Sequence, residues 1–233
     1  DRKAVQLGVF RMNEVVDGAF VQDRFPGQKP GWLWKCLWPA DLRATTVKAG
    51  RAPMGTGEGG RITYELKTRT GELVRAKEAF LRFMHELETI PAKDFVAWTR
   101  RRLDPDALLR TMAATLLLGH WDSCRFNSNN YFLYFDRQGR AHFIPYDLDN
   151  TLGTGLFDTG RVSVWSVSEA CPLVRRLLEV PEYRERYRQE LRRMLDPKNG
   201  LFDPGVASLR IMQWQQLIEP HLPNATGERQ AIQ

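Results

Sequence analysis

The sequence predicts an α+β fold in which short strands are followed by a larger set of helices. Two apolar runs at residues 131–135 and 141–146 flank a turn that contains Gly139, and this pattern is typical of a β-hairpin. From residue 76 onward the apolar residues recur mostly with helical spacing. With 233 residues, 42% of them hydrophobic, the chain can bury a sizeable core as one large domain or two lobes.

The first elements are expected to be two strands separated by a helix. A strand is expected at residues 4–16, with Glu14 near its end, and a helix at 17–25 before a Pro/Gly-containing stop. A second strand is expected at 31–38, where apolar residues occupy both faces except at Lys35. Because burying an unpaired ammonium is costly, Lys35 must either reach water at a sheet edge or meet a phosphate or carboxylate.

A glycine-rich stretch at residues 53–60, PMGTGEGG, matches the pattern G-x-G-x-x-G. In a dinucleotide-binding fold this pattern leads into a helix. Here RITYELK follows and has the character of a strand, so a hairpin loop is favoured over a phosphate-binding loop.

Helices are expected over most of the remaining chain. The helix at 76–90 ends at Pro91, and the helix that begins at Asp104 has an acidic cap and an early proline. This helix stops at Gly119 and therefore delivers the loop that follows. An irregular, Ser/Val-containing stretch after Gly153 is interpreted either as an activation-type or substrate-facing segment or, equally well, as a surface loop and strand. The other helices are expected at 93–103, 172–180, 181–196 and 203–222.

Composition excludes some classes of protein and leaves others open. The net charge is +6, but acidic residues are interleaved with the basic ones, which favours solvated helix faces over a nucleic-acid surface. The chain has neither an apolar run long enough to span a bilayer nor a recognisable signal peptide. The spacing of Cys36, Cys124 and Cys171 gives neither a zinc site nor a disulfide framework. A monomer is expected.

The densest set of chemically useful side chains lies at residues 119–153. Asp122 is followed by Asn127 and Asn130, then by the hairpin, and then by Asp147 and Asp149. Phosphoryl transfer requires a carboxylate near the attacking hydroxyl, and an amide oxygen with a second carboxylate to hold Mg²⁺. Protein kinases place such groups in the order Asp, Asn, strand pair, Asp. The alternative is a polar loop and a hairpin that ends in an ordinary D-x-D turn.

Several stretches resemble the CotH kinase family, the spore-coat-protein-H-like atypical protein kinases. They cover nearly the whole chain, and the most specific begins at Asp122 and closes with FIPYDLDNTLG at 143–153. The others are LGVFRMNEVVDGAFVQDRF at 7–25, GWLWK at 31–35, ITYELKT at 62–68 and PLVRRLLEVPEYRERYRQEL at 172–191.

The resemblance implies a protein-kinase-like fold with two lobes. Residues 1–75 would form a truncated N-terminal β lobe with insertion strands, and 76–233 a mainly helical C-terminal lobe that carries the catalytic and metal loops. Family members have further strands before the segment matched here, so the chain is expected to be a fragment. The implied activity is transfer of the γ-phosphate of ATP, with Mg²⁺ or Mn²⁺, to serine or threonine of secreted or cell-surface proteins. A non-catalytic surface binding module of the same fold is the alternative.

Carried over by position, the resemblance also implies roles for individual residues. Asp122 would be the catalytic aspartate, and Asp147 the metal-binding aspartate. The metal-binding amide would be Asn130, which directly precedes the strand, or Asn127, which has the general kinase spacing. Asp149 would share the metal. Two further candidates would contact the nucleotide, Glu14 and Lys35.

Overall fold

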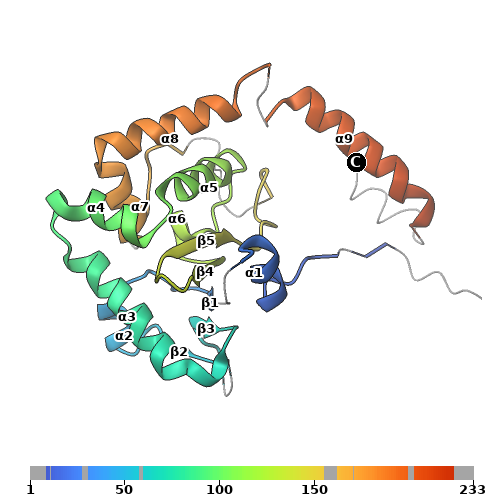
Figure 1. Cartoon of the computed structure of the whole chain (residues 1–233). Coiled ribbons are helices and arrows are strands. Elements are labelled where there is room, and N and C mark those ends of the chain that lie inside the picture. The colour runs from blue at the N-terminus through green and yellow to red at the C-terminus, as the bar shows by residue number, and fades with distance from the viewer. Residues whose placement is uncertain are drawn as a thin grey trace, which may run out of the picture. The chain divides into compact units, whose positions relative to one another are not determined.

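The computed structural model describes residues 9–10, 12–27, 31–57, 60–154, 162–169, 171–198 and 202–222. The chain divides into two compact units, one formed by residues 1–15 with 192–233 and the other by residues 16–191. The second unit contains the whole described sheet and the helices that surround it (Figure 1).

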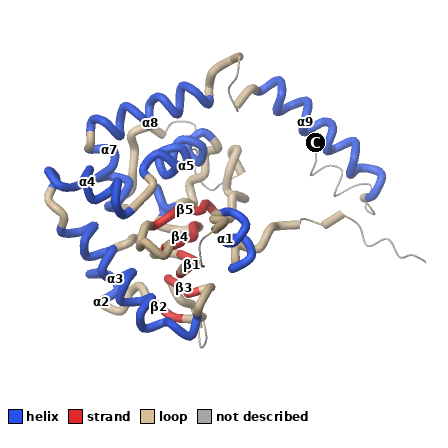
Figure 2. The backbone as a smooth tube through the Cα atoms, viewed as in Figure 1, coloured by secondary structure: helices blue, strands red, loops and turns tan. Residues whose placement is uncertain are grey.

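The sheet of the second unit has five strands in the order β2-β3-β1-β4-β5 (Figure 2). β1 is antiparallel to both β3 and β4, and β4 is antiparallel to β5, so the expected hairpin and the strands around Lys35 and Tyr64 are confirmed. The bounds are β1 (Trp32–Cys36), β2 (Met54–Gly55), β3 (Tyr64–Leu66), β4 (Tyr131–Phe135) and β5 (Ala141–Pro145).

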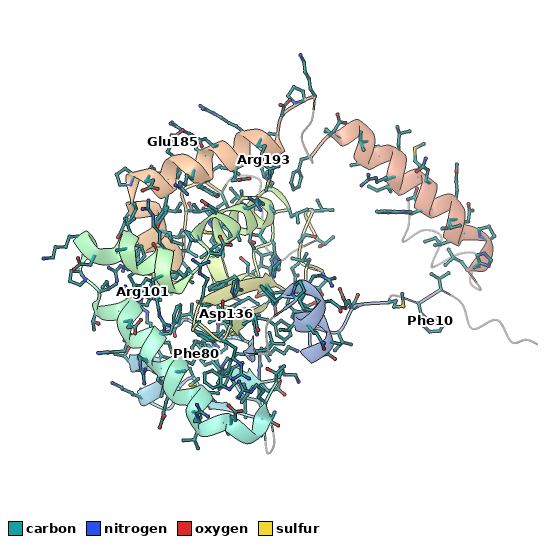
Figure 3. The ribbon with its side chains drawn as sticks, in the orientation of Figure 1. Phe10, Phe80, Arg101, Asp136, Glu185 and Arg193 are labelled. Atoms are coloured by element: carbon teal, nitrogen blue, oxygen red, sulfur yellow. The ribbon has the colours of Figure 1, made fainter. Side chains whose placement is uncertain are left out.

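The two faces of the sheet bury different side chains. On one face, Val21 of α1 (Gly18–Arg24) packs in a cluster with Leu33 and Phe132. On the other face lies Phe80 of α3 (Leu73–Thr89), which Figure 3 labels. Its ring centroid is 5.3 Å from that of Trp34. Because both faces are covered by apolar side chains, β4 is buried along its whole length.

Most helices occur where the sequence predicts them. α5 (Pro105–Leu117) begins at Asp104, whose Oδ1 accepts a hydrogen bond from the Ala107 N–H at 3.0 Å, as expected for an acidic cap. Two short helices, α2 (Ala44–Lys48) and α6 (Cys124–Asn127), are not predicted from the sequence. The remaining helical elements are η1 (Thr70–Glu72), α4 (Ala92–Arg102), α7 (Pro172–Glu179), α8 (Pro181–Met194), α9 (Pro204–Ile218) and η3 (Glu219–His221).

The strand expected at residues 4–16 is wrong for the part that the structure describes. Residues 9–10 and 12–16 form no strand, while 4–8 and 11 lie outside the described residues. Met12 is 96% exposed, and Phe10 is 73% exposed. The apolar residues of this segment therefore do not mark a strand in its described part. Likewise, residues 162–169 contain no strand.

The glycine-rich stretch does not connect an antiparallel hairpin. β2 pairs with β3 in parallel, with Met54 opposite Tyr64. At Gly57 the backbone has a φ of +86°, and a Cβ atom there would lie 2.6 Å from Oε1 of Glu65. The left-handed backbone favours glycine here, whereas the close approach is to the end of a flexible side chain that can move aside. Residues 58–59 lie outside the described residues.

The proposed division into lobes at residue 75 stays a prediction. The sheet takes β1 to β3 from the first expected lobe and β4 and β5 from the second. In the part of the chain that the structure describes, none of the helices combines the length and apolar character needed to cross a membrane.

Candidate functional site

The carboxylate of Asp122 is held by three side-chain amides. Oδ1 accepts hydrogen bonds from Nδ2 of Asn127 at 2.7 Å and from Nδ2 of Asn129 at 3.0 Å. Oδ2 accepts one from Nδ2 of Asn130 at 2.9 Å. A carboxylate offers about four lone-pair positions, so these three donors leave one acceptor position, on Oδ2.

The loop that carries these amides is tightly wound. Asn127 ends α6, and its N–H donates to the Ser123 carbonyl oxygen at 2.9 Å. Ser128 and Asn130 then adopt left-handed backbone conformations, with φ of 51° and 52°. Asparagine tolerates this region better than most residues do. The winding brings amides at three different sequence positions onto one carboxylate.

The same loop is fastened to the segment that follows β1. The Trp38 N–H donates to Oδ1 of Asn129 at 2.7 Å, and the Ala40 N–H donates to the Ser128 carbonyl oxygen at 2.8 Å. The hydroxyl of Tyr131 donates to the Ala40 carbonyl oxygen at 2.7 Å. The position of Asp122 is therefore fixed relative to the sheet.

Asp147 is brought beside Asn130 by the hairpin. Tyr131 at the start of β4 pairs with Pro145 at the end of β5, and the Tyr146 N–H donates to the Asn130 carbonyl oxygen at 3.1 Å. Asp147 comes next, is exposed, and has a left-handed φ of 53°. The amide at the start of one strand and the carboxylate after the next thus lie at the same edge of the sheet.

The loop after Asp147 is also anchored. The Leu152 N–H donates to the Leu118 carbonyl oxygen at 2.7 Å, which ties the loop to the end of α5. Asp149 is exposed, and its Oδ1 accepts a hydrogen bond from Nδ2 of Asn150 at 2.9 Å.

The ring of His120 is buried near both aspartate loops. Its side chain is 1% exposed, and burial lowers its pKa. The backbone of Asn150 and the charges of Asp122, Asp147 and Asp149 act in the opposite direction on that pKa. One buried ring therefore lies within electrostatic reach of all three carboxylates.

Lys35 approaches the second aspartate loop from the neighbouring strand. The side chain is half-buried, and its Nζ lies 4.7 Å from the centroid of the Tyr146 ring, directly before Asp147. Within the described parts of the chain, no carboxylate forms an ion pair with this ammonium. A cation with apolar and aromatic neighbours at the edge of the site is suited to bind an anion.

Glu14 belongs to the other unit and is exposed, so its relation to these residues stays a prediction.

The donor chemistry of the site fits a hard divalent cation. Asn127 and Asn130 turn their nitrogen atoms toward Asp122, which leaves their carbonyl oxygens available, whereas the oxygen of Asn129 is used by Trp38. No three His, Cys, Asp or Glu side chains converge as a metal site among the described residues. A bound cation would therefore take Asp147, one amide oxygen and oxygen ligands from outside the protein, as Mg²⁺ commonly does.

Sequence reasoning missed two residues that shape the site. Asn129 was not among the candidates, although three asparagines within eight residues of an aspartate are a signal that could have indicated it. Arg125 was also missed. It is 2% exposed, and its guanidinium donates to the carbonyl oxygens of Val164 at 2.6 Å and Ser166 at 2.8 Å, so it fastens α6 to a distant segment.

The chain was compared with protein-family models and with curated proteins. No curated protein matches the chain. The family model described as CotH kinase protein matches residues 4–233, which is nearly the whole chain and includes every residue of the site described above. The chain therefore belongs to the CotH kinase family.

Proposed function

We propose that this chain is an atypical protein kinase that transfers the γ-phosphate of ATP to serine or threonine side chains of secreted or cell-surface proteins. The observation that carries the proposal is the amide clamp on Asp122, which leaves one acceptor position on Oδ2. A catalytic aspartate needs such a position to accept a hydrogen bond from the substrate hydroxyl. Membership of a kinase family supports the same assignment.

The other candidates take the remaining roles. Asp147 and the amide oxygen of Asn130, or of Asn127, would hold Mg²⁺ or Mn²⁺, and Asp149 would share it. When bound, the cation would neutralise charge on the phosphates of ATP. Lys35 would contact a phosphate, since it reaches the loop of Asp147 through the Tyr146 ring.

Transfer of labelled phosphate from ATP to a mixture of Ser/Thr-containing proteins, or to the chain itself, tests the proposal. We expect Asp122→Asn to lower kcat about 10²–10⁴-fold, the usual contribution of a positioned acid or base. Asp147→Asn is expected to abolish transfer by removing a metal ligand. Asp23→Asn is the matched control, because Asp23 is exposed on α1 and outside the site. Undiminished transfer by Asp147→Asn would contradict the proposal.

A non-catalytic surface module is the second candidate, and one observation favours it. Both oxygens of Asp122 already accept hydrogen bonds from side-chain amides of the protein. Thermal unfolding with and without ATP and Mg²⁺ discriminates between the two. A nucleotide at a hundred times its Kd should stabilise the chain by about 2.7 kcal/mol. Absence of both this shift and phosphate transfer would favour the binding module.

A further inference from the structure

Two cysteines that are far apart in the sequence meet beside the Asp122 loop. Cys124 begins α6, Cys171 directly precedes α7, and their Sγ atoms are 3.4 Å apart although 47 residues separate them. The third cysteine, Cys36 in β1, is fully buried, and its Sγ lies 3.7 Å from the Trp34 carbonyl oxygen.

The contact between the two cysteines is supported by a backbone and side-chain framework. The Ser168 N–H donates to the Arg125 carbonyl oxygen, and the Cys171 N–H donates to the Ser168 carbonyl oxygen, both at 3.1 Å. The guanidinium of Arg125 donates to the hydroxyl of Tyr187 in α8 at 2.6 Å. These bonds hold the segment before α7 against α6. The two sulfur atoms are therefore brought together by fixed parts of the chain.

The distance is within reach of a covalent bond. The sulfur atoms of a disulfide are about 2.05 Å apart, so each Sγ would have to move by about 0.7 Å, which small side-chain rotations can supply. The pKa of Cys171 is lowered, mainly by the hydrogen bond from the Cys124 thiol and also by the Val174 N–H at the start of α7, although burial acts in the opposite direction. The same hydrogen bond and burial raise the pKa of Cys124. As residues, Cys124 is partly exposed and Cys171 is 1% exposed.

We propose that Cys124 and Cys171 form a reversible disulfide that fastens the Asp122 loop to the start of α7. The reaction is thiol–disulfide exchange with a small-molecule or protein disulfide. One cysteine of the pair attacks the oxidant as its thiolate, forms a mixed disulfide and releases one thiol, and the thiolate of the other cysteine then attacks that cysteine's Sγ and releases the second thiol. The protein loses two protons and two electrons, and the oxidant disulfide is reduced to two thiols.

The bond acts on the site through α6. That helix spans only Cys124–Asn127 and carries at its far end the amide that donates to Asp122. A covalent link at its first residue restricts the whole helix, since four residues form little more than one turn. The oxidised chain is therefore expected to exchange the backbone amides of residues 122–130 more slowly than the reduced chain.

The experiment uses the full chain, reduced, desalted and then incubated with oxidised glutathione below its unfolding temperature. Peptide mapping without reductant is expected to show Cys124 linked to Cys171 and Cys36 as a free thiol. The unfolding temperature of the oxidised form should be about 5–10 °C higher than that of the reduced form, and dithiothreitol should reverse the change. Amide exchange measured on the same two samples should slow at residues 122–130.

Three variants test whether the thermal shift comes from the Cys124–Cys171 link rather than from oxidation elsewhere in the chain. Cys36→Ala should keep the link and the thermal shift, whereas Cys124→Ser and Cys171→Ser should each lose both. Mapping of the unmodified chain decides the matter even if a variant fails to fold. A chain that carries only glutathione adducts, links Cys36, or keeps all three thiols free would overturn the proposal. None of these measurements depends on phosphate transfer, so the result stands apart from the proposed function.

Discussion

The three asparagines that hold Asp122 differ in what their oxygen atoms do. Asn129 uses its oxygen to accept the Trp38 N–H, so both ends of its amide are engaged within the protein. Asn127 and Asn130 donate to Asp122 through nitrogen and have their oxygens available for a cation. Positioning of Asp122 and binding of metal can therefore be separated by substitution.

Asn129→Ala is expected to lower the rate of phosphate transfer and to leave stabilisation by ATP and Mg²⁺ unchanged. A hydrogen bond to a charged group contributes about 1.5–3 kcal/mol, so the loss in kcat should be about 10- to 150-fold. Asn130→Ala should lose both rate and stabilisation if Asn130 is the metal ligand. Initial rates and thermal unfolding of the two purified variants check this.

Asn127→Ala completes this comparison. If Asn127→Ala rather than Asn130→Ala loses the nucleotide-dependent stabilisation, then the metal amide is Asn127. A loss of stabilisation in Asn129→Ala would contradict the separation of roles, since its oxygen is bound to the backbone of Trp38.

Burial of His120 gives the stability of the protein a pH dependence. Its pKa is lowered in the folded chain, so as pH falls below about 6.5 the unfolded chain binds a proton that the folded chain does not yet bind. Stability is therefore expected to fall with pH from that point, by at most about 1.4 kcal/mol per pH unit for this one group.

His120→Gln should flatten this slope in urea unfolding between pH 7 and 5, measured without metal or nucleotide. His85→Gln is the control, because His85 is exposed on α3 and the substitution should leave the slope unchanged. An identical slope in all three proteins would show that another group is responsible.

At the scale of elements, Arg125 connects α6 with two other parts of the second unit. Its buried guanidinium donates to the carbonyl oxygens of Val164 and Ser166 and to the hydroxyl of Tyr187 in α8. Arg125→Met keeps much of the aliphatic bulk but leaves these three acceptors without their donor. Val164 and Ser166 are exposed, so water can reach their carbonyl oxygens, whereas the bond to Tyr187 is buried. At about 1–3 kcal/mol for one unsatisfied buried group, the free energy of unfolding should fall by at least about 1 kcal/mol.

Chemical denaturation of Arg125→Met measures this loss. Arg137→Met is the matched control, because Arg137 is exposed in the turn between β4 and β5 and should change stability by less than about 0.5 kcal/mol. Equal midpoints for the two variants would mean that water replaces the guanidinium at its acceptors.

The elements that the sequence predicted best have both a regular apolar pattern and residues that mark where the element begins or ends. α5 has an acidic cap, an early proline and a broad apolar stripe, and the β4–β5 hairpin has a glycine-containing turn between two apolar runs. α2 and α6 are only five and four residues long, which is too short for a helical period to be visible. The strand expected at 4–16 is absent from the described residues 9–10 and 12–16, because apolar residues in sequence do not reveal whether a neighbouring strand exists.

At the scale of the whole chain, the predictability of the site depends on how far apart its parts are in sequence. Asn130 and Asp147 flank one hairpin, so their proximity follows from local pairing. Lys35 reaches Tyr146 only because β1 lies beside β4, a pairing across about a hundred residues that no local pattern indicates. The contact between Cys124 and Cys171 could not be predicted either, because 47 residues separate the two cysteines and α6 itself was not predicted.

Stability is expected to be distributed unevenly along the chain. α3 and α9 have similar lengths, 17 and 15 residues, but α3 buries five side chains whereas no residue of α9 is buried. A helix of about 15 residues is marginal in water unless packing supports it. The backbone hydrogen bonds of α9 should therefore open with a far smaller free energy than those of α3.

Hydrogen exchange followed by mass spectrometry compares the two helices in one sample. Amides of α3 are expected to exchange only through global unfolding, which for a domain of this kind costs about 5–15 kcal/mol, and amides of α9 through local opening. We expect the rates to differ by at least about 10³-fold, since each 1.4 kcal/mol is a factor of ten. Equal protection would mean that the exposed apolar residues of α9, among them Trp214 and Leu217, are covered in solution. Dilution of the sample would then show whether a second copy of the chain covers them, because protection by a partner falls with concentration.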